Sequence, residues 1–188
     1  MRPRSRKLQQ LFTAAVAAGI GTVMAVELDV AYVETPPAGV AMMMDLAAVG
    51  PDDYVIDLGT GDGRIAIAAA LRGARAKGVD IDPARVREAV ANAEAAGVAD
   101  RVEFIVEDLF DTDLSKATVV AMYLNEEVNL RLRPTLLAVL EPGTRVVSHN
   151  FGMGDWQPDR HVNFLNRSGG NVFLHDIYLW VVPTRQAR

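Results

Sequence analysis

Glycines at positions 59, 61 and 63 lie between two apolar runs in VIDLGTGDGRIAIAAA, residues 55–70. Because glycine has no side chain, the backbone can approach a ligand closely where a strand turns into a helix. A dinucleotide-binding fingerprint would place its third glycine at position 64, which is occupied by Arg64. The loop therefore predicts a ligand-binding turn and argues against a nicotinamide dehydrogenase.

Acidic residues stand just before these glycines and at the ends of the next two expected strands. Asp57 precedes the loop, Asp80 follows Gly63 by seventeen residues, and Asp108 lies in VEDLF at 106–110. An acid at position 57 can hold an ammonium group, and an acid at position 80 can accept hydrogen bonds from two ribose hydroxyls. An acid at position 108 can accept a hydrogen bond from the adenine amino group. S-adenosylmethionine carries all three groups and has no pyrophosphate. The alternative is that the acids only cap the helices that follow the strands.

Transfer of a sulfonium methyl group needs mainly a positioned nucleophile and the exclusion of water. An amine acceptor must also lose its proton to a neighbouring group. Residues expected near the carboxyl ends of the later strands are candidates for this role, although no spacing singles one out: Tyr123, Asn125, Glu126 and His149. A histidine that only bonds the backbone is an equal alternative for His149.

The elements that would position these residues alternate between strand and helix, with Gly-Pro and Pro-Gly stops between them. This pattern predicts an α/β fold: a doubly wound, mostly parallel, seven-stranded sheet with helices on both faces. The expected strands are 54–58, 76–80, 102–106, 118–124, 145–150, 172–175 and 177–182, and the expected helices are 38–49, 64–72, 82–96 and 126–140.

The first 26 residues differ in composition from the rest. The basic run RPRSRK is followed by LFTAAVAAGIGTVMAV, residues 11–26, which contains no charge. Sixteen residues are short for a membrane-spanning helix, which needs about 20. The order of a basic run followed by an apolar stretch, however, matches a signal peptide. We predict a signal peptide or membrane anchor at 1–26 and a catalytic domain at 27–188. The alternative is an apolar helix packed on a cytoplasmic domain.

Composition narrows the classes of function. The chain has 188 residues, enough for one domain, and it has no cysteine, which excludes thiolate metal sites and cysteine nucleophiles. Its three histidines are scattered, so no metal site is predicted. The net charge is −5, but residues 26–188 hold 15 basic and 24 acidic residues, a balance of −9. This charge argues against a nucleic-acid partner.

The motifs DLGTGDGR (57–64), GVDIDP (78–83) and VEDLF (106–110) resemble motifs I, II and III of the class I, Rossmann-like methyltransferases. With YVETP (32–36) and RPTLLAVLEPGTRVVSHNFGMGDW (133–156), the chain resembles the bacterial relatives of the ATP synthase c-subunit lysine methyltransferase over about residues 30–160. Bacterial members often carry an N-terminal signal-like or membrane segment. Position 34 is Glu where proline is usual in the family.

The resemblance implies methylation of a protein lysine, as eukaryotic members do on membrane proteins; a small-molecule N- or O-methyltransferase and a SAM-binding protein without transfer activity are the alternatives. It places the YVETP residues Tyr32, Thr35 and Pro36 over the cofactor at the substrate mouth. It places Tyr123, Leu124 and Asn125, at the end of the fourth expected strand, on the acceptor side; His149 is a candidate from its place at a strand's carboxyl edge. The implied cofactor-binding residues are Asp57, Gly59, Thr60, Gly61, Gly63, Asp80, Ile81, Asp108 and Leu109.

Overall fold

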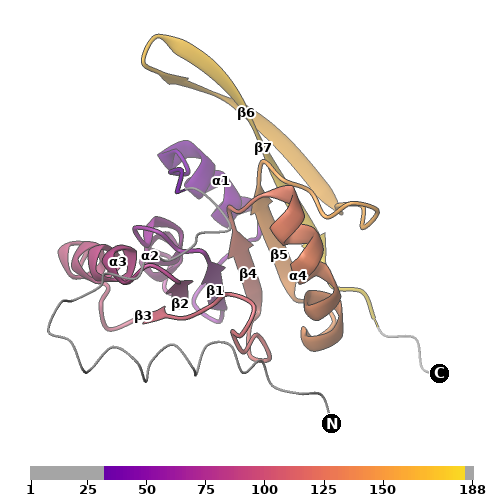
Figure 1. Cartoon of the computed structure of the whole chain (residues 1–188), viewed down its shortest axis with the longest axis horizontal. Coiled ribbons are helices and arrows are strands. Elements are labelled where there is room, and N and C mark those ends of the chain that lie inside the picture. Colours follow the sequence, from indigo (N-terminus) through magenta and orange to yellow (C-terminus); the bar gives the residue numbers. More distant parts are fainter. Residues whose placement is uncertain (1–31, 185–188) are drawn as a thin grey trace, which may run out of the picture.

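Alternating strands and helices build a single seven-stranded sheet in the computed structural model, which describes residues 32–184 (Figure 1). The predicted N-terminal apolar helix, signal or anchor at 1–26 lies outside the described residues. The helices are α1 (Pro37–Leu46), α2 (Arg64–Leu71), α3 (Pro83–Ala95) and α4 (Glu126–Val139). The strands are β1 (Tyr54–Leu58), β2 (Arg75–Asp80), β3 (Val102–Val106), β4 (Val119–Met122), β5 (Arg145–His149), β6 (Arg160–Ser168) and β7 (Asn171–Val181).

The sheet has the strand order β3-β2-β1-β4-β5-β7-β6. Strands β1 to β5 are parallel, whereas β7 lies antiparallel between β5 and β6. From β1 the chain adds β2 and β3 toward one edge of the sheet and then returns to add β4 and β5 toward the other edge. In such sheets a ligand binds outside the carboxyl ends of the strands at the point where the order reverses. The predicted seven-stranded Rossmann-like sheet is therefore confirmed, and its topology indicates where a ligand site should lie.

The C-terminal strands differ from the prediction. The two expected strands at 172–175 and 177–182 form one continuous strand, β7, because the backbone amide of Asp176 donates to Asn150 Oδ1 and its carbonyl accepts from the Asn150 amide. Strand β6 was not predicted at all. Its sequence RHVNFLNRS is largely polar and exposed, as suits an edge strand, so it lacks the apolar pattern of a buried one.

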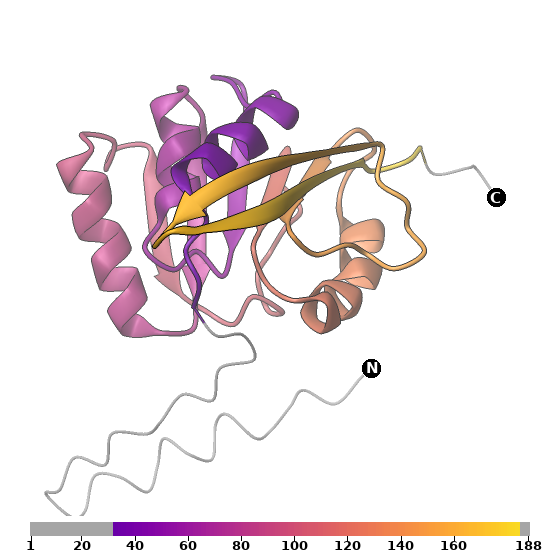
Figure 2. The same cartoon turned by 90° about the horizontal axis from the view of Figure 1, so that it is seen from above.

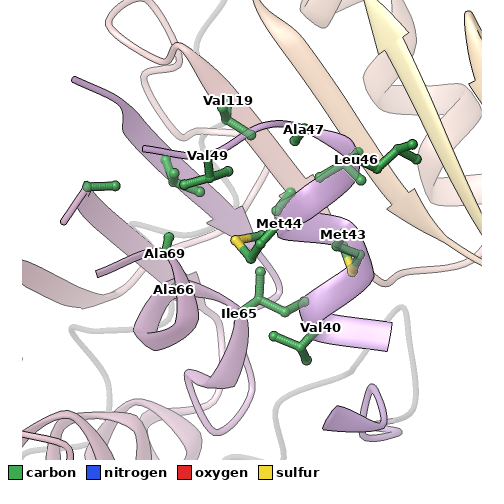
Figure 3. Close-up of a cluster of buried hydrophobic side chains, with 14 of the residues drawn as sticks. Val40, Met43, Met44, Leu46, Ala47, Val49, Ile65, Ala66, Ala69 and Val119 are labelled. Atoms are coloured by element: carbon green, nitrogen blue, oxygen red, sulfur yellow. The ribbon is translucent and has the colours of Figure 1, made fainter. Parts of the chain in front are cut away.

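The two faces of the sheet are covered by different helices (Figures 1 and 2). Helices α1 and α2 pack on one face in a shared apolar cluster, in which Met43 and Met44 of α1 are fully buried. Figure 3 shows these two side chains beside Ile65 and Ala66 of α2. Helix α4 covers the other face, where Leu132 and Leu136 pack against the strands. Met43 and Met44 therefore lie on the core-facing side of α1.

Strands β6 and β7 form a long hairpin that projects from the body of the molecule (Figure 1). Near its turn, Leu165, Val172, Phe173 and Leu174 are exposed. Nothing among residues 32–184 forms a helix with both the length and the apolar character needed to cross a membrane.

Candidate functional site

A cavity of about 410 Å³ opens at the carboxyl ends of β1, β2 and β4, where the strand order reverses. Its wall combines the glycine loop, the ends of β2 and β3, the end of β4 and the YVETPP segment at 32–37. Its charged lining residues are six carboxylates and two guanidinium groups: Glu34, Asp62, Asp80, Asp82, Glu107, Asp108, Arg64 and Arg85. The cavity is therefore strongly acidic.

The glycine loop comes closest to the YVETPP segment at Gly61, which has φ +54°. A Cβ atom there would lie 2.3 Å from Cε2 of Tyr32, so only glycine lets this ring rest on the loop. The Asp80 carboxylate holds the loop from the other side, because Oδ2 accepts from the Gly61 amide at 2.9 Å and Oδ1 accepts from the Asp82 amide at 2.9 Å. Asp80 therefore fixes the loop and also faces the cavity.

Asp57 lies behind the loop rather than in the cavity wall. Its side chain is buried, and Oδ2 accepts a hydrogen bond of 2.6 Å from the hydroxyl of Thr60, which does line the cavity. Burial raises the pKa of Asp57 to about 7, against the opposing effects of the Thr60 hydroxyl and the Ala66 amide. In this structure Asp57 thus supports the loop through Thr60.

The other end of the cavity wall follows β2 and β3. Ile81, Asp108 and Leu109, which the family resemblance implies bind the cofactor, line it. The Asp108 side chain also accepts from the Phe110 amide at 3.0 Å, which fixes the turn after β3. This part of the cavity has the carboxylates and apolar side chains that a ribose and an adenine require.

Arg64 ties the YVETPP segment to the glycine loop, a contact that sequence reasoning missed. Its guanidinium contacts the Asp62 carboxylate at 2.5 Å and the Glu34 carboxylate at 2.9 Å, and it donates to the Thr35 carbonyl at 2.9 Å. The Asp62 carboxylate raises the pKa of Arg64 further above its usual value. Arg85 adds a second tie, with its guanidinium 4.3 Å from the ring centroid of Tyr32.

The predicted acceptor-side residues separate into two groups. Tyr123 lines the cavity, and its ring centroid lies 4.0 Å from that of His149. His149 itself is fully buried and does not line the cavity, but its Nδ1 atom lies 3.1 Å from the Thr35 hydroxyl. Asn125 instead caps α4, where its Oδ1 accepts from the Val128 amide at 2.8 Å.

Pro36 occupies the capping position before α1, so it sets the direction in which the YVETPP segment enters the helix. The structure thus places Tyr32, Thr35 and Tyr123 in the cavity wall, and His149 contacts Thr35 and Tyr123 from outside it. It leaves Asn125 in a helix cap.

Some of the site residues that were not predicted from the sequence have a recognisable pattern around them, and others do not. Arg64 stands at the position where a dinucleotide fingerprint needs glycine, and Asp62 lies two residues before it, so this pair was detectable. Glu34 was noticed only as a departure from proline. His175, whose Nδ1 lies 2.9 Å from Nε2 of His149, had no signal, because the contact depends on the pairing of β7 with β5.

The lining residues fit S-adenosylmethionine. This cofactor carries a sulfonium and an ammonium group, and an acidic cavity stabilises such charges in a way that it would not stabilise a pyrophosphate. The Arg64 guanidinium, which could have attracted phosphate, is already paired with the carboxylates of Asp62 and Glu34. The absence of a side chain at Gly61 leaves room for the ring of Tyr32, which lines the cavity together with Gly59 and Thr60.

Comparison with known proteins agrees with this fit. A family profile described as the ANTKMT methyltransferase domain matches residues 57–160. A "Protein-lysine N-methyltransferase" from Saccharolobus islandicus is 44% identical over 155 residues, which cover 81% of this chain and 94% of that protein. The human lysine N-methyltransferase of the ATP synthase c-subunit is 33% identical over 105 residues, 56% of this chain, and the match spans only 45% of the human protein.

A solved structure from Salinibacter ruber is also similar. It is described as an RNA methyltransferase in complex with S-adenosyl-L-homocysteine, and it is 49% identical with a TM-score of 0.74, covering 82% of this chain and 97% of that one. The family profile, the archaeal relative and the acidic cavity at the glycine loop all agree. The chain belongs to the family of the ANTKMT methyltransferase domain, and it is a class I methyltransferase that uses S-adenosylmethionine.

Proposed function

We propose that this enzyme methylates the side-chain amine of a lysine in a protein. The observation that carries the proposal is the acidic cavity, whose lining has more carboxylates than guanidinium groups and so suits a cationic acceptor as well as a cationic cofactor. Support also comes from the Saccharolobus relative, which aligns over 94% of its length and is named for protein-lysine methylation.

The chemistry divides between the cofactor and this chain. Bound S-adenosylmethionine supplies a methyl group on a sulfonium, so the bond from the methyl carbon to sulfur breaks as the bond to the amine nitrogen forms. Tyr123, directly after β4, and Thr35 of the YVETPP segment line the acceptor end and orient the amine. Arg64 keeps the YVETPP segment over the cavity, which excludes water. Such positioning is worth about 7–11 kcal/mol of the barrier.

RNA is the second candidate acceptor, because the Salinibacter relative is described as an RNA methyltransferase. We favour protein on grounds of charge. A phosphate backbone is bound by lysine and arginine, whereas residues 26–188 carry a balance of −9 and the cavity mouth is acidic. A small-molecule acceptor and a binding protein without transfer remain outcomes of the test below.

The test uses the full chain with methyl-labelled S-adenosylmethionine and a lysate of the cells in which the protein occurs. We expect label that resists ribonuclease, is released by protease and is recovered as methyl-lysine. Label lost on ribonuclease treatment would replace protein by RNA as the acceptor. Label only in small molecules, or cofactor binding without transfer, would overturn the lysine proposal.

Two variants show whether the label comes from this site. Asp80→Ala should abolish labelling together with most of the affinity for S-adenosylhomocysteine, because Asp80 holds the Gly61 amide and faces the cavity. Glu94→Ala, an exposed position on α3, is the matched control and should behave as wild type.

We further propose that residues 1–26 direct the enzyme to a membrane or through it. The support is compositional: a basic run followed by sixteen residues without charge. Fractionation of cells that express the full chain, compared with a chain starting at Glu27, tests this directly. Equal recovery of both in the cytoplasmic fraction would overturn the proposal in favour of a cytoplasmic enzyme.

A further inference from the structure

Thr35 is held at the acceptor end of the cavity by contacts on three sides. Its carbonyl accepts from Arg64, its methyl group packs toward Gly39 of α1, and its hydroxyl lies 3.1 Å from Nδ1 of His149. A Cβ atom at Gly39 would come within 3.1 Å of the Thr35 methyl carbon, so this methyl group packs closely against the helix. Thr35 thus lines the cavity while its hydroxyl contacts His149.

His149 connects this hydroxyl to a second histidine. Its Nε2 atom lies 2.9 Å from Nδ1 of His175, so both ring nitrogens are engaged while the ring is fully buried. Burial lowers the pKa of His149 to about 3, which keeps the imidazole neutral. A neutral imidazole donates from one nitrogen and accepts at the other, so it can pass a proton without holding a charge.

His175 brings the connection toward the surface. It is only partly buried on β7, where the ring of Phe164 stacks on it with centroids 5.0 Å apart. The ionisable groups that face the histidine pair are Asp176 on β7 and Tyr123 directly after β4, and Asp176 is in turn bonded to His161 at 2.7 Å. The one ionisable side chain of α1, Asp45, is paired elsewhere with Arg72.

We propose that Thr35, His149 and His175 form a proton relay that carries the proton of the acceptor lysine out to solvent. This inference rests on the proposed lysine acceptor. The lysine ammonium gives a proton to Thr35 Oγ1 as the threonine hydroxyl proton moves to His149 Nδ1. The Nε2 proton of His149 passes to His175 Nδ1, and His175 releases its Nε2 proton to water. The amine left behind is neutral and attacks the methyl carbon.

Thr35 is the catalytic residue of the relay, because of its three members only Thr35 lines the cavity; the two histidines position it and carry the proton. Thr35→Val keeps the shape of the side chain but removes the hydroxyl, and Thr35→Ser restores it. We expect Thr35→Val and His149→Gln to lower kcat at neutral pH by about 100-fold or more. Their affinity for S-adenosylhomocysteine should stay within about twofold of wild type, because neither group fixes the glycine loop.

The pH profile separates a relay from a merely structural role. As the pH approaches the ordinary lysine pKa of about 10.4, the acceptor arrives already neutral, so the deficit of the variants should shrink toward wild-type kcat. Thr35→Ser should keep most of the activity at every pH. A deficit of equal size from pH 7 to 10, or wild-type kcat for Thr35→Val at pH 7, would overturn the relay.

His175→Asn gives an independent test at a partly exposed position, where folding is least at risk. Its kcat at pH 7 should fall and be partly restored by added imidazole, whereas unchanged kcat would remove His175 from the relay. His161→Asn, a neighbouring exposed histidine, is the control and should keep wild-type kcat. Failure of the wild-type chain to methylate any lysine would instead refute the proposed function on which the relay rests.

Discussion

Gly61 is the residue where the glycine loop and the YVETPP segment come closest. Gly61→Ala would place a Cβ atom 2.3 Å from the Tyr32 ring and strain a backbone with φ +54°. We expect the ring to be displaced and the affinity for S-adenosylhomocysteine to fall by about tenfold or more, with a strain cost of about 1–2 kcal/mol. Titration calorimetry and thermal unfolding measure the two effects.

Gly97 supplies the control for this substitution. It also has positive φ, +70°, but a Cβ atom there would meet nothing within 4 Å. Gly97→Ala should therefore lose stability by a similar strain and bind the cofactor product as wild type does. Equal loss of binding in both variants would mean that strain, and not contact with Tyr32, explains the effect at Gly61.

Asn125 was predicted to act on the acceptor, and the structure gives it a different task as the cap of α4. Asn125→Ala should lower the free energy of unfolding by about 1 kcal/mol, whereas Asn125→Asp, which also caps, should not. Urea unfolding measures the difference. A kcat reduced more than tenfold with normal stability would restore the acceptor role.

At the scale of elements, the YVETPP segment depends on α2 through Arg64 at the first position of that helix. Arg64→Lys keeps the charge but cannot contact the Asp62 and Glu34 carboxylates and the Thr35 carbonyl together. We expect faster amide exchange over residues 32–36 and weaker binding of S-adenosylhomocysteine. Hydrogen-exchange mass spectrometry follows the first and calorimetry the second.

Arg72→Lys is the matched control, because Arg72 makes an ion pair with Asp45 on the surface, away from the cavity. It should leave both exchange at 32–36 and binding unchanged. If Arg64→Lys behaves like Arg72→Lys, the YVETPP segment is held by other contacts, such as that of Arg85 with Tyr32.

Elements with a local signal were predictable, and those defined by tertiary pairing were not. Strands β1, β3, β4 and β5 have apolar runs, Asp80 is the last residue of β2, and Asp108 lies two residues after β3. Strand β6 has no such run, because an edge strand buries little. The contact of His149 with His175 joins residues 26 positions apart on antiparallel neighbours, so no spacing rule reaches it.

At the scale of the whole molecule, two buried groups give stability opposite dependences on pH. Asp57 has a pKa raised from 3.8 to about 7, so between these values the unfolded chain releases a proton that the folded chain keeps, and stability falls as pH rises. His149 has a pKa lowered from 6.5 to about 3, so the unfolded chain binds a proton that the folded chain does not, and stability falls as pH falls. The two effects oppose each other between about pH 4 and 6.5.

Replacing either group should leave stability with the pH dependence that the other group causes. With Asp57→Asn, the free energy of unfolding should rise more steeply with pH than in wild type over this window, and with His149→Asn it should fall with pH. Each change in slope approaches about 1.4 kcal/mol per pH unit. Urea unfolding at three pH values between 4.5 and 6.5 measures the slopes. Curves parallel to wild type would show that neither group titrates abnormally.

The packing of α1 has a consequence for synthesis of the chain. This helix ends at Leu46, yet it packs against β5 and β7, and β7 ends at Val181. A ribosome adds about 5–20 residues per second, so roughly 7–27 s separate the two elements during translation. Throughout that interval α1 can pack against α2, but Met43 and Met44 lack the cover that β7 supplies. A nascent chain stalled before β7 therefore exposes the part of α1 that β7 covers in the finished fold, and we expect it to bind chaperones at this stage.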